Sequence, residues 1–263
     1  MIRIVLNGAA GRMGKTIIQV MSNDNELKLV GAIEAKNSPN IGKDSGELAG
    51  IGQNNIIITS NIEEVINDAD VIIDFSSPDS LVRNIDCALK YNVGLVIGTT
   101  GIKNDDIENM KEASKFIPII WSPNFSVGIT LLSKIVKLCA EILNDGYDVE
   151  IVEAHHRMKK DAPSGTAIKL LNILKEVYRT NDVVCGRNGL IGERPKNQIG
   201  VSVVRGGDII GEHSVLFLGN GERLELTHKA TSRETFARGA LKAAKFIYHK
   251  GKGFYTMEQV LGL

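Results

Sequence analysis

The sequence predicts an α/β fold, with an N-terminal Rossmann-type parallel-sheet domain followed by a C-terminal α+β domain that has an open, mostly antiparallel sheet. Three observations support this prediction. Up to about residue 126, short β-branched runs alternate with amphipathic segments, which is typical of a parallel sheet covered on both faces. A glycine-rich turn follows the first run, as in dinucleotide-binding folds. Beyond a long helical segment, runs that alternate apolar and polar residues indicate a sheet with one open face.

Apolar runs in the first part of the chain have the length and the β-branched composition of buried strands. Amphipathic segments with the spacing of helices lie between them, near residues 12–23, 61–67, 79–91 and 103–115. This order predicts a dinucleotide-binding domain over residues 1–126. The predicted strands are IRIVL (2–6), LKLVGAI (27–33), NIIIT (55–59), VIIDF (71–75), GLVIG (94–98) and PIIWS (118–122).

The later part of the chain changes character after a helix that we predict over residues 127–144. Glycine turns separate the last three strands, and the change of pattern places a domain boundary near residue 126. A further helix, RETFARGALKAAKFIYH (233–249), and a short tail close the chain. The predicted strands here are DVEIVEAH (148–155), GVSVVR (200–205), GEHSVLFLG (211–219) and ERLELTHKA (222–230).

The composition predicts a soluble cytoplasmic protein with a small ligand. The formal net charge is zero, from 31 basic and 31 acidic side chains, so no overall field attracts nucleic acid or an anionic membrane. Cys87, Cys139 and Cys185 lie far apart, and this sparse, odd set favours a reducing compartment over a disulfide framework. No stretch reaches membrane-spanning length, and the apolar run at the N-terminus is too short for a secretion signal.

The turn IVLNGAAGRMGK, after the first predicted strand, has the features of a pyrophosphate-binding turn. Gly8, Gly11 and Gly14 leave room for backbone amides to approach a pyrophosphate at the helix N-terminus. Ala9 occupies the first glycine position of the G-x-G-x-x-G pattern. Glu34 ends the second strand, where a carboxylate can accept hydrogen bonds from ribose hydroxyls. The alternative is an ordinary strand-to-helix turn beside a surface glutamate.

Two further turns follow predicted strands, IGTTG (97–101) and WSPNFSVG (121–128). Ligands of open α/β sheets bind at the carboxyl ends of the strands, so both turns are candidates to line the nicotinamide half of the site. Each turn taken alone is an ordinary loop. Their shared position after successive strands is the basis of the prediction.

The segment EAHHRMKKDAPSGTA (153–167) concentrates positive charge, with two histidines, an arginine and two lysines within residues 155–160. Ser164 is a natural N-cap for the helix that begins at Gly165. A helix N-terminus beside Lys159 and two imidazoles forms a pocket for a small, multiply charged carboxylate, and a histidine there can donate a proton. A solvated basic loop is the alternative interpretation.

The paired histidines do not indicate a metal site. Adjacent side chains of a strand point to opposite faces, so His155 and His156 cannot easily bind one ion together. The sequence also contains no H-x-x-x-H motif and no carboxylate at a spacing that would complete a set of ligands.

These residues together resemble the dihydrodipicolinate (4-hydroxy-tetrahydrodipicolinate) reductase family, nicotinamide-dependent enzymes of the diaminopimelate and lysine pathway. The resemblance spans nearly the whole chain. The run of histidine, lysine, serine, glycine and threonine in the basic loop is its most specific part. The matching motifs are GAAGRMG, IGTTG, SPNFSVG, EAHHRMKKDAPSGTA, RGGDIIGEHSVLF, ERLELTHKATSRETFARGAL and VLGL.

The resemblance implies NADH or NADPH as cofactor and a cyclic dicarboxylate as substrate, which accepts hydride at C4 and then a proton at the neighbouring carbon. By position, His155 resembles the proton donor of the family, and Lys159 its partner in acid catalysis and carboxylate binding. The implied substrate contacts are His156, Lys159, Ser164, Gly165 and Thr166. The implied cofactor contacts are Gly8, Ala9, Ala10, Gly11, Arg12, Met13, Glu34, Gly98, Thr99, Thr100, Ser122, Pro123, Asn124 and Phe125.

The resemblance also implies that residues 127–233 bind substrate and assemble a homotetramer, while residues 234–263 return to the first domain. One position departs from some members, which carry arginine directly after the acidic residue. Here Ala35 follows Glu34, and Lys36 comes next. The choice between NADH and NADPH therefore stays open, because Glu34 repels a 2′-phosphate that Lys36 can still reach.

Two other functions stay open at this point. Another dehydrogenase of amino or dicarboxylic acids would account for the nucleotide turn but not for the paired histidines beside an N-cap. A redox-sensing regulator would bind the dinucleotide without turning it over, and it would not need a proton donor such as His155.

Overall fold

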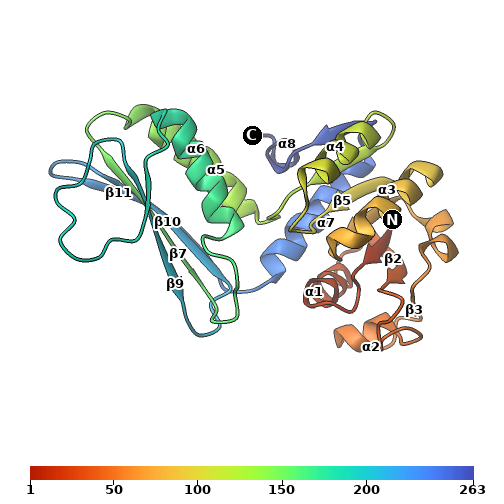
Figure 1. Cartoon of the computed structure of the whole chain (residues 1–263). Helices are drawn as coiled ribbons and strands as arrows, with labels where there is room; N and C mark the ends of the chain where they lie inside the picture. Colours follow the sequence, from red (N-terminus) through yellow and green to blue (C-terminus); the bar gives the residue numbers. More distant parts are fainter. The chain divides into compact units, whose positions relative to one another are not determined.

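The computed structural model describes residues 1–263, and the chain separates into two units. One unit comprises Met1–Val127 together with Arg233–Leu263, and the other comprises Gly128–Ser232. The first unit contains a parallel sheet and the second an open, mixed sheet (Figure 1). The fold class predicted from the sequence is confirmed.

Seven parallel strands form the sheet of the first unit, in the order β12-β6-β5-β4-β1-β2-β3. Every strand predicted in the first part of the chain is present, and β12 adds one near the C-terminus. The strands are β1 (Ile2–Asn7), β2 (Leu27–Ile33), β3 (Ile58–Thr59), β4 (Val71–Asp74), β5 (Gly94–Ile97), β6 (Pro118–Trp121) and β12 (Gly253–Tyr255).

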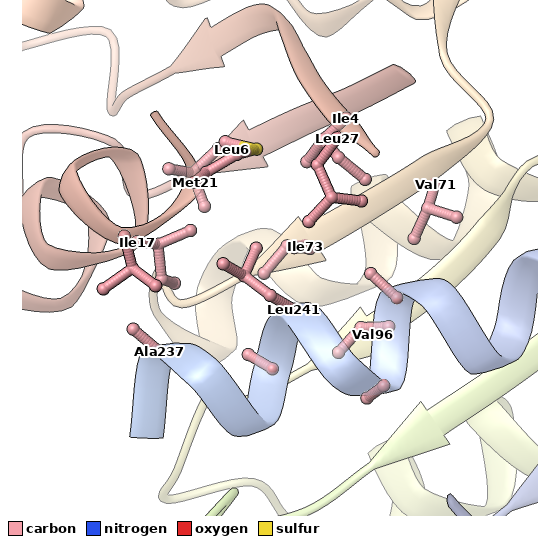
Figure 2. Packing of buried hydrophobic residues seen from close by; sticks show 14 of the residues in the cluster. Ile4, Leu6, Ile17, Met21, Leu27, Val71, Ile73, Val96, Ala237 and Leu241 are labelled. Carbon is pink, nitrogen blue, oxygen red and sulfur yellow. The ribbon is translucent and has the colours of Figure 1, made fainter. Parts of the chain in front are cut away.

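Helices pack against both faces of this sheet because the central strands are apolar on both sides. In β1, Ile4 enters the core that α1 and α7 cover, while Val5 enters the core that α3 and α4 cover. Figure 2 shows Ala237 and Leu241 of α7 in the same core as Ile73 of β4. The helices are α1 (Arg12–Met21), α2 (Ser45–Ala49), α3 (Pro78–Tyr91), α4 (Asn104–Ala113), α7 (Glu234–Tyr248) and α8 (Met257–Leu261).

Two predicted elements are shorter than the sequence pattern indicated. The strand predicted over 55–59 is reduced to β3, because Asn55 adopts a left-handed conformation with φ of 61° and its backbone amide donates to Asp44. The helix predicted over 61–67 is instead two 3-10 turns, Ile62–Glu64 and Ile66–Asp68. Ile62 and Ile66 are both buried, so the helix-like spacing of these apolar residues reflects burial of two successive turns.

The sheet of the second unit has the strand order β11-β10-β7-β9-β8. β10 is antiparallel to both of its neighbours, whereas β9 is parallel to β7 and β8. The helices α5 (Val127–Ile142) and α6 (Gly165–Tyr178) cover one face. The strands are β7 (Asp148–His155), β8 (Val183–Cys185), β9 (Ile199–Arg205), β10 (Gly211–Leu218) and β11 (Arg223–Ala230).

The two faces of this second sheet differ in burial, as the alternating pattern predicted. Ile151 and Val215 point into the core beneath α5 and α6 and are completely buried. Residues on the opposite face, such as Val152 and Leu216, are only half-buried, and Val204 is exposed. The longest helix, α5, has 16 residues, and none of the helices combines the length and the hydrophobicity of a membrane span.

Candidate active site

The glycine turn after β1 brings backbone very close to backbone, as a pyrophosphate-binding turn requires. Gly8 has a φ of 81°, and a Cβ there would lie 2.5 Å from the carbonyl oxygen of Phe75. A Cβ on Gly14 would collide with the carbonyl oxygen of Gly8. The start of α1 can therefore approach the turn only because these positions carry no side chain. This geometry fits a dinucleotide whose pyrophosphate lies at the helix N-terminus.

Glu34 lies beside this turn and organises it. Its Oε1 accepts a hydrogen bond from the Ala10 amide at 3.0 Å, and its Oε2 accepts one from the Ala35 amide at 3.2 Å. A carboxylate has further lone pairs, so Glu34 can still accept from ribose hydroxyls. Glu34 also lines a pocket of about 320 Å³ together with Gly8, Gly11, Ala35 and Lys36. The pocket and the turn thus fit the adenosine half of a dinucleotide.

Sequence patterns did not single out the part of the pocket wall that follows β4. The segment FSSPDS (75–80) contributes Phe75, Ser76, Ser77 and Ser80, and the next turn of α3 contributes Arg83 and Asn84. The rule that selected the turns after β5 and β6 could have found it, since β4 ends at the same edge of the sheet. The remaining wall comes from Asn7, Ile33, Ser60 and Ile62.

A buried carboxylate, Asp74 at the end of β4, connects the turns at this edge. Its oxygens accept from the side chain of Asn84 at 2.6 Å and from the hydroxyl of Thr99 at 3.0 Å. They also accept from the backbone amide of Ser76 at 2.9 Å. The hydroxyl of Ser76 and the side chain of Asn7 donate to it as well; all of these donors are neutral, and Asp74 has no exposed surface. Asp74 therefore fixes the turn after β4 and the turn after β5 in one arrangement.

The remaining predicted cofactor residues occupy the same edge or the start of α1. Gly98 approaches so closely that a Cβ would collide with the ring of Phe75, and this ring packs on Phe125 with centroids 5.8 Å apart. The hydroxyl of Ser122 donates to the carbonyl oxygen of Asn124 at 2.7 Å. Arg12, Thr100 and Pro123 are exposed, Met13 is half-buried, and Ala9 is buried.

In the second unit, the basic loop contains a buried dyad at the end of β7. The Nδ1 of His155 lies 2.6 Å from Oε2 of Glu153. Arg205 of β9 donates to both oxygens of Glu153 at 2.8 Å, and the backbone amide of Ser164 donates to Oε1 at 3.0 Å. Glu153 has no exposed surface, and His155 is 8% exposed. The histidine is thus held by a carboxylate that is itself fixed from three sides.

The surroundings of His155 lower its pKa below the ordinary 6.5. Burial is the largest cause, the charges of Lys159 and Arg205 act in the same direction, and Glu153 opposes them. Lys159 is 21% exposed in its side chain and pairs with Asp161 at 2.9 Å. Because a depressed pKa leaves the imidazole neutral near pH 7, an added anion is needed to make His155 an acid.

The start of α6 adjoins this dyad, as the N-cap pattern predicted. The hydroxyl of Ser164 accepts from the Ala167 amide at 3.2 Å and lies 3.0 Å from Nε2 of His213. Ser164 is buried, so its side chain caps the helix and contacts His213. Gly165 is exposed and Thr166 half-buried in the first turn, and His156 is half-buried.

His213 was not among the residues singled out from the sequence. It lies on β10, and its ring meets that of His155 edge-on with centroids 5.1 Å apart. Burial, followed by the charge of His155, lowers the pKa of His213 to about 4. His213 lies on the same face of β10 as the buried Val215 and Phe217, and the pairing of His213 with Glu153 on β7 brings it beside His155.

The structure therefore gathers the predicted cofactor residues in the first unit and the predicted substrate residues in the second. A parallel sheet with a glycine turn, an acidic residue after the second strand and a pocket between them defines the class of dinucleotide-binding oxidoreductases. The buried histidine dyad adds an acid–base group to this class.

Comparison with known proteins identifies the family. The patterns described as dihydrodipicolinate reductase, N-terminus and C-terminus, match residues 2–125 and 128–261. The chain is 43% identical to a 4-hydroxy-tetrahydrodipicolinate reductase of Syntrophotalea carbinolica, over 100% of both chains. It is 45% identical to one of Anaeromyxobacter dehalogenans, over 100% of this chain and 98% of the relative.

Solved structures agree with this assignment. The fold matches a dipicolinate-bound dihydrodipicolinate reductase from Paenisporosarcina sp. TG-14, with a TM-score of 0.78, 26% identity and 97% coverage of each chain. The chain belongs to the dihydrodipicolinate reductase family and is an NAD(P)H-dependent oxidoreductase. The resemblance seen in the sequence is confirmed.

Proposed function

We propose that His155 delivers the proton and that Lys159 binds a carboxylate in the reaction of this family, the reduction of 4-hydroxy-tetrahydrodipicolinate to tetrahydrodipicolinate. Family membership over the full length supplies the reaction, with NADH or NADPH as reductant. One observation supports the role of His155. This histidine begins the basic cluster, and its ring nitrogen Nδ1 pairs with the buried carboxylate of Glu153. Such pairing is what an acid–base histidine needs.

The residues of the first unit suit the cofactor. The turn Gly8–Met13 and Glu34 would hold the pyrophosphate and the ribose, and the turns Gly98–Thr100 and Ser122–Phe125 would line the nicotinamide half. When bound, the reduced nicotinamide supplies the hydride that the substrate accepts at C4. Glu34 would disfavour a 2′-phosphate, and Ala35 supplies no cation, so we expect NADH to serve at least as well as NADPH.

The residues of the second unit suit a dianion. Lys159 and the amides at Gly165 and Thr166 would bind the carboxylates of the substrate, with His156 at the side of the pocket. A bound dianion reverses the local field that lowers the pKa of His155, so the substrate itself makes the proton donor effective. Protonation of the carbon next to C4 then follows.

Substitution of His155 tests this role. His155→Gln retains a hydrogen-bonding group but carries no titratable proton, so kcat should fall about 10²–10⁴-fold, the usual contribution of one general acid. The KM for the substrate should change far less, because Lys159 and the α6 amides remain. Lys159→Ala should impair both constants, since it removes charge used in binding and in catalysis. Steady-state kinetics between pH 6 and 9 measures both, and a near-normal kcat for His155→Gln would remove His155 as the donor.

The open face of the second sheet supports an assembly. No helix of this unit covers Val152, Leu216 and the exposed Val204, which lie on the open face among polar and charged side chains, and uncovered apolar side chains of this kind often meet a partner. We therefore expect a homotetramer assembled through these sheets, and light scattering at micromolar concentration should report a mass of four chains. A monomer would contradict this. Three free cysteines and a cytosolic type of pathway support a cytoplasmic location.

A further inference from the structure

Glu153 is a buried carboxylate with no assigned role in the reaction. It lies two residues before His155 on the same face of β7, because side chains alternate along a strand. The side chain pairs with three groups around it: His155, Arg205 and the Ser164 amide. A carboxylate in a fully buried position is costly unless it is paired in this way.

We propose that Glu153 is a positioning residue for His155, which holds the imidazole proton on Nδ1 and thereby makes Nε2 the atom that delivers the proton to the substrate. This inference rests on the proposed function of His155 as the donor. It concerns which ring nitrogen acts and what fixes it.

The charge of Glu153 determines which nitrogen of His155 carries the hydrogen. Burial alone would raise its pKa, but hydrogen bonds from Arg205, His155 and the Ser164 amide outweigh burial and keep the pKa below the ordinary value. Glu153 is therefore ionised at neutral pH, and an ionised carboxylate can only accept hydrogen bonds. The 2.6 Å separation then requires that Nδ1 of His155 carries the hydrogen.

The other side of the His155 ring lies against β10. Nε2 of His155 faces Gly211 of β10, where a Cβ would lie 3.0 Å from this nitrogen. Glycine thus preserves the space next to Nε2. Nδ1 is engaged with a buried carboxylate, so Nε2 is the nitrogen that a substrate can reach. The protein thus fixes Nδ1 and keeps the bulk of a side chain on residue 211 away from Nε2.

The bonds broken and formed in the proton transfer balance with His155 as the donor. After hydride addition at C4, an electron pair develops on the neighbouring carbon. The Nε2–H bond of the His155 imidazolium breaks, a C–H bond forms at that carbon, and neutral imidazole remains with its hydrogen on Nδ1. Glu153 stabilises the imidazolium before the transfer. It stays ionised throughout, because its ion pair with Arg205 stabilises the carboxylate.

Three charged groups set the protonation of His155 from the elements around it, Glu153 on β7, Lys159 in the loop and Arg205 on β9, while the ring of His213 on β10 contacts it edge-on. Only Glu153 favours the charged ring. Glu153→Gln keeps an acceptor for Nδ1 but removes this charge. The pH above which kcat declines should therefore move down by one to two units, and kcat above that pH should fall about 10–100-fold. At lower pH the loss should shrink, and the substrate KM should stay within a few fold.

A matched control is available on the same strand. Glu150 also pairs with arginines, Arg187 at 2.9 Å and Arg194 at 3.2 Å, but it points to the opposite face of β7. Glu150→Gln removes the same charge from the same strand and should leave the kcat–pH profile in place. Loss of fold alone would lower the amount of active enzyme in either variant without moving the profile.

Gly211 provides a second pair of variants. Gly211→Ala places a methyl group against Nε2 and should lower kcat at all pH values, whereas Gly206→Ala, where a Cβ meets nothing within 4 Å, should not. If Gly211→Ala keeps the normal kcat, Nε2 is not the transferring atom and the inference is wrong.

The unsubstituted protein gives a test that does not depend on folding of a variant. With ¹⁵N-labelled histidine, the signals of His155, assigned by their absence in His155→Gln, should show hydrogen on Nδ1 and none on Nε2 in the neutral ring. The opposite tautomer, or an unmoved kcat–pH profile in Glu153→Gln, would overturn the inference. His155→Gln kinetics are measured in parallel, so a normal kcat in that variant would instead overturn the proposed function.

Discussion

Each unit of the molecule buries one carboxylate completely near the end of a central strand, and the two are paired in opposite ways. Asp74 in the first unit receives only neutral donors, from Asn84, Thr99 and Ser76. Glu153 in the second unit is paired with the guanidinium of Arg205 and with an imidazole. Neutral donors can hold a loop in place, but they cannot respond to pH. A carboxylate paired with arginine keeps its charge while its histidine partner gains and loses a proton.

This difference follows from what each site has to recognise. In the proposed function, the first unit would contact its ligand through backbone amides and hydroxyls at the ends of parallel strands, and Asp74 would fix the shape of that edge. The second unit would need a group whose protonation changes during the reaction, and Glu153 would be part of its electrostatic balance. The two carboxylates therefore predict different results when they are neutralised.

The largest effect is expected for Asp74→Asn. The amide nitrogen would face a buried donor such as the Thr99 hydroxyl or the Asn84 amide, and one charge-assisted acceptor would be lost. We expect the free energy of unfolding to fall by about 3 kcal/mol, which chemical denaturation measures. The KM for NADH should rise, because the turn that holds Thr99 loosens, while the kcat–pH profile should keep its position.

A downward shift of the kcat–pH profile in Asp74→Asn, like the shift expected for Glu153→Gln, would contradict the difference drawn between the two carboxylates. Such a result would mean that Asp74 shares in proton transfer. Asp86 on α3, with no buried partner network, provides a control for removal of a negative charge from the same unit, since Asp86→Asn should leave both the unfolding free energy and the KM for NADH nearly unchanged.

A smaller effect is expected from His213, which is buried next to the Glu153 dyad. Its pKa in the folded protein, about 4, lies below the ordinary 6.5, so the unfolded chain binds the proton more readily. The neutral imidazole thus contributes its full stability above about pH 6.5 and loses it as the pH falls toward 4. The free energy of unfolding that is lost through His213 amounts to about 2 kcal/mol by pH 5.

His213→Gln should reduce this acid sensitivity, because glutamine can still reach the Ser164 hydroxyl but takes up no proton. The measurement is the free energy of unfolding at pH 7 and at pH 5 in both proteins, compared as a difference of slopes. Equal slopes would show that His213 is not kept neutral by burial. The other titratable groups are common to both proteins, so their contributions cancel in this comparison.

The contrast between the two carboxylates also marks how far the sequence could predict the site. Periodicity predicted the strands on which Asp74 and Glu153 lie, and the cluster around His155 was visible because its residues are adjacent in the chain. In the sequence, Glu153 could not be distinguished from the other polar residues of an alternating strand. Its partner Arg205 is 52 residues away, and only the parallel pairing of β7 with β9 brings the two together. Contacts of this kind depend on strand register, which local patterns do not specify.

The fold shows the same limit. Long apolar or alternating runs predicted all the central strands, whereas β8 and β12 have only three residues each and depend on neighbouring strands for their hydrogen bonds. The turn after β4 escaped notice because serines, unlike glycines or charged clusters, are common in ordinary loops. Placement at the edge shared with β5 and β6 gives these serines their significance.

The smallest effect is expected when a positive charge is added beside Glu34 in the first unit. Ala35 and Lys36 line the adenosine pocket, so Ala35→Arg places a guanidinium where a 2′-phosphate would lie. A guanidinium pairs bidentately with phosphate, and kcat/KM for NADPH relative to NADH should rise about tenfold. Ala35→Gln, with similar reach and no charge, should leave the ratio unchanged. If both cofactors respond equally to the arginine, residue 35 does not face the 2′ position, and Glu34 alone sets the preference.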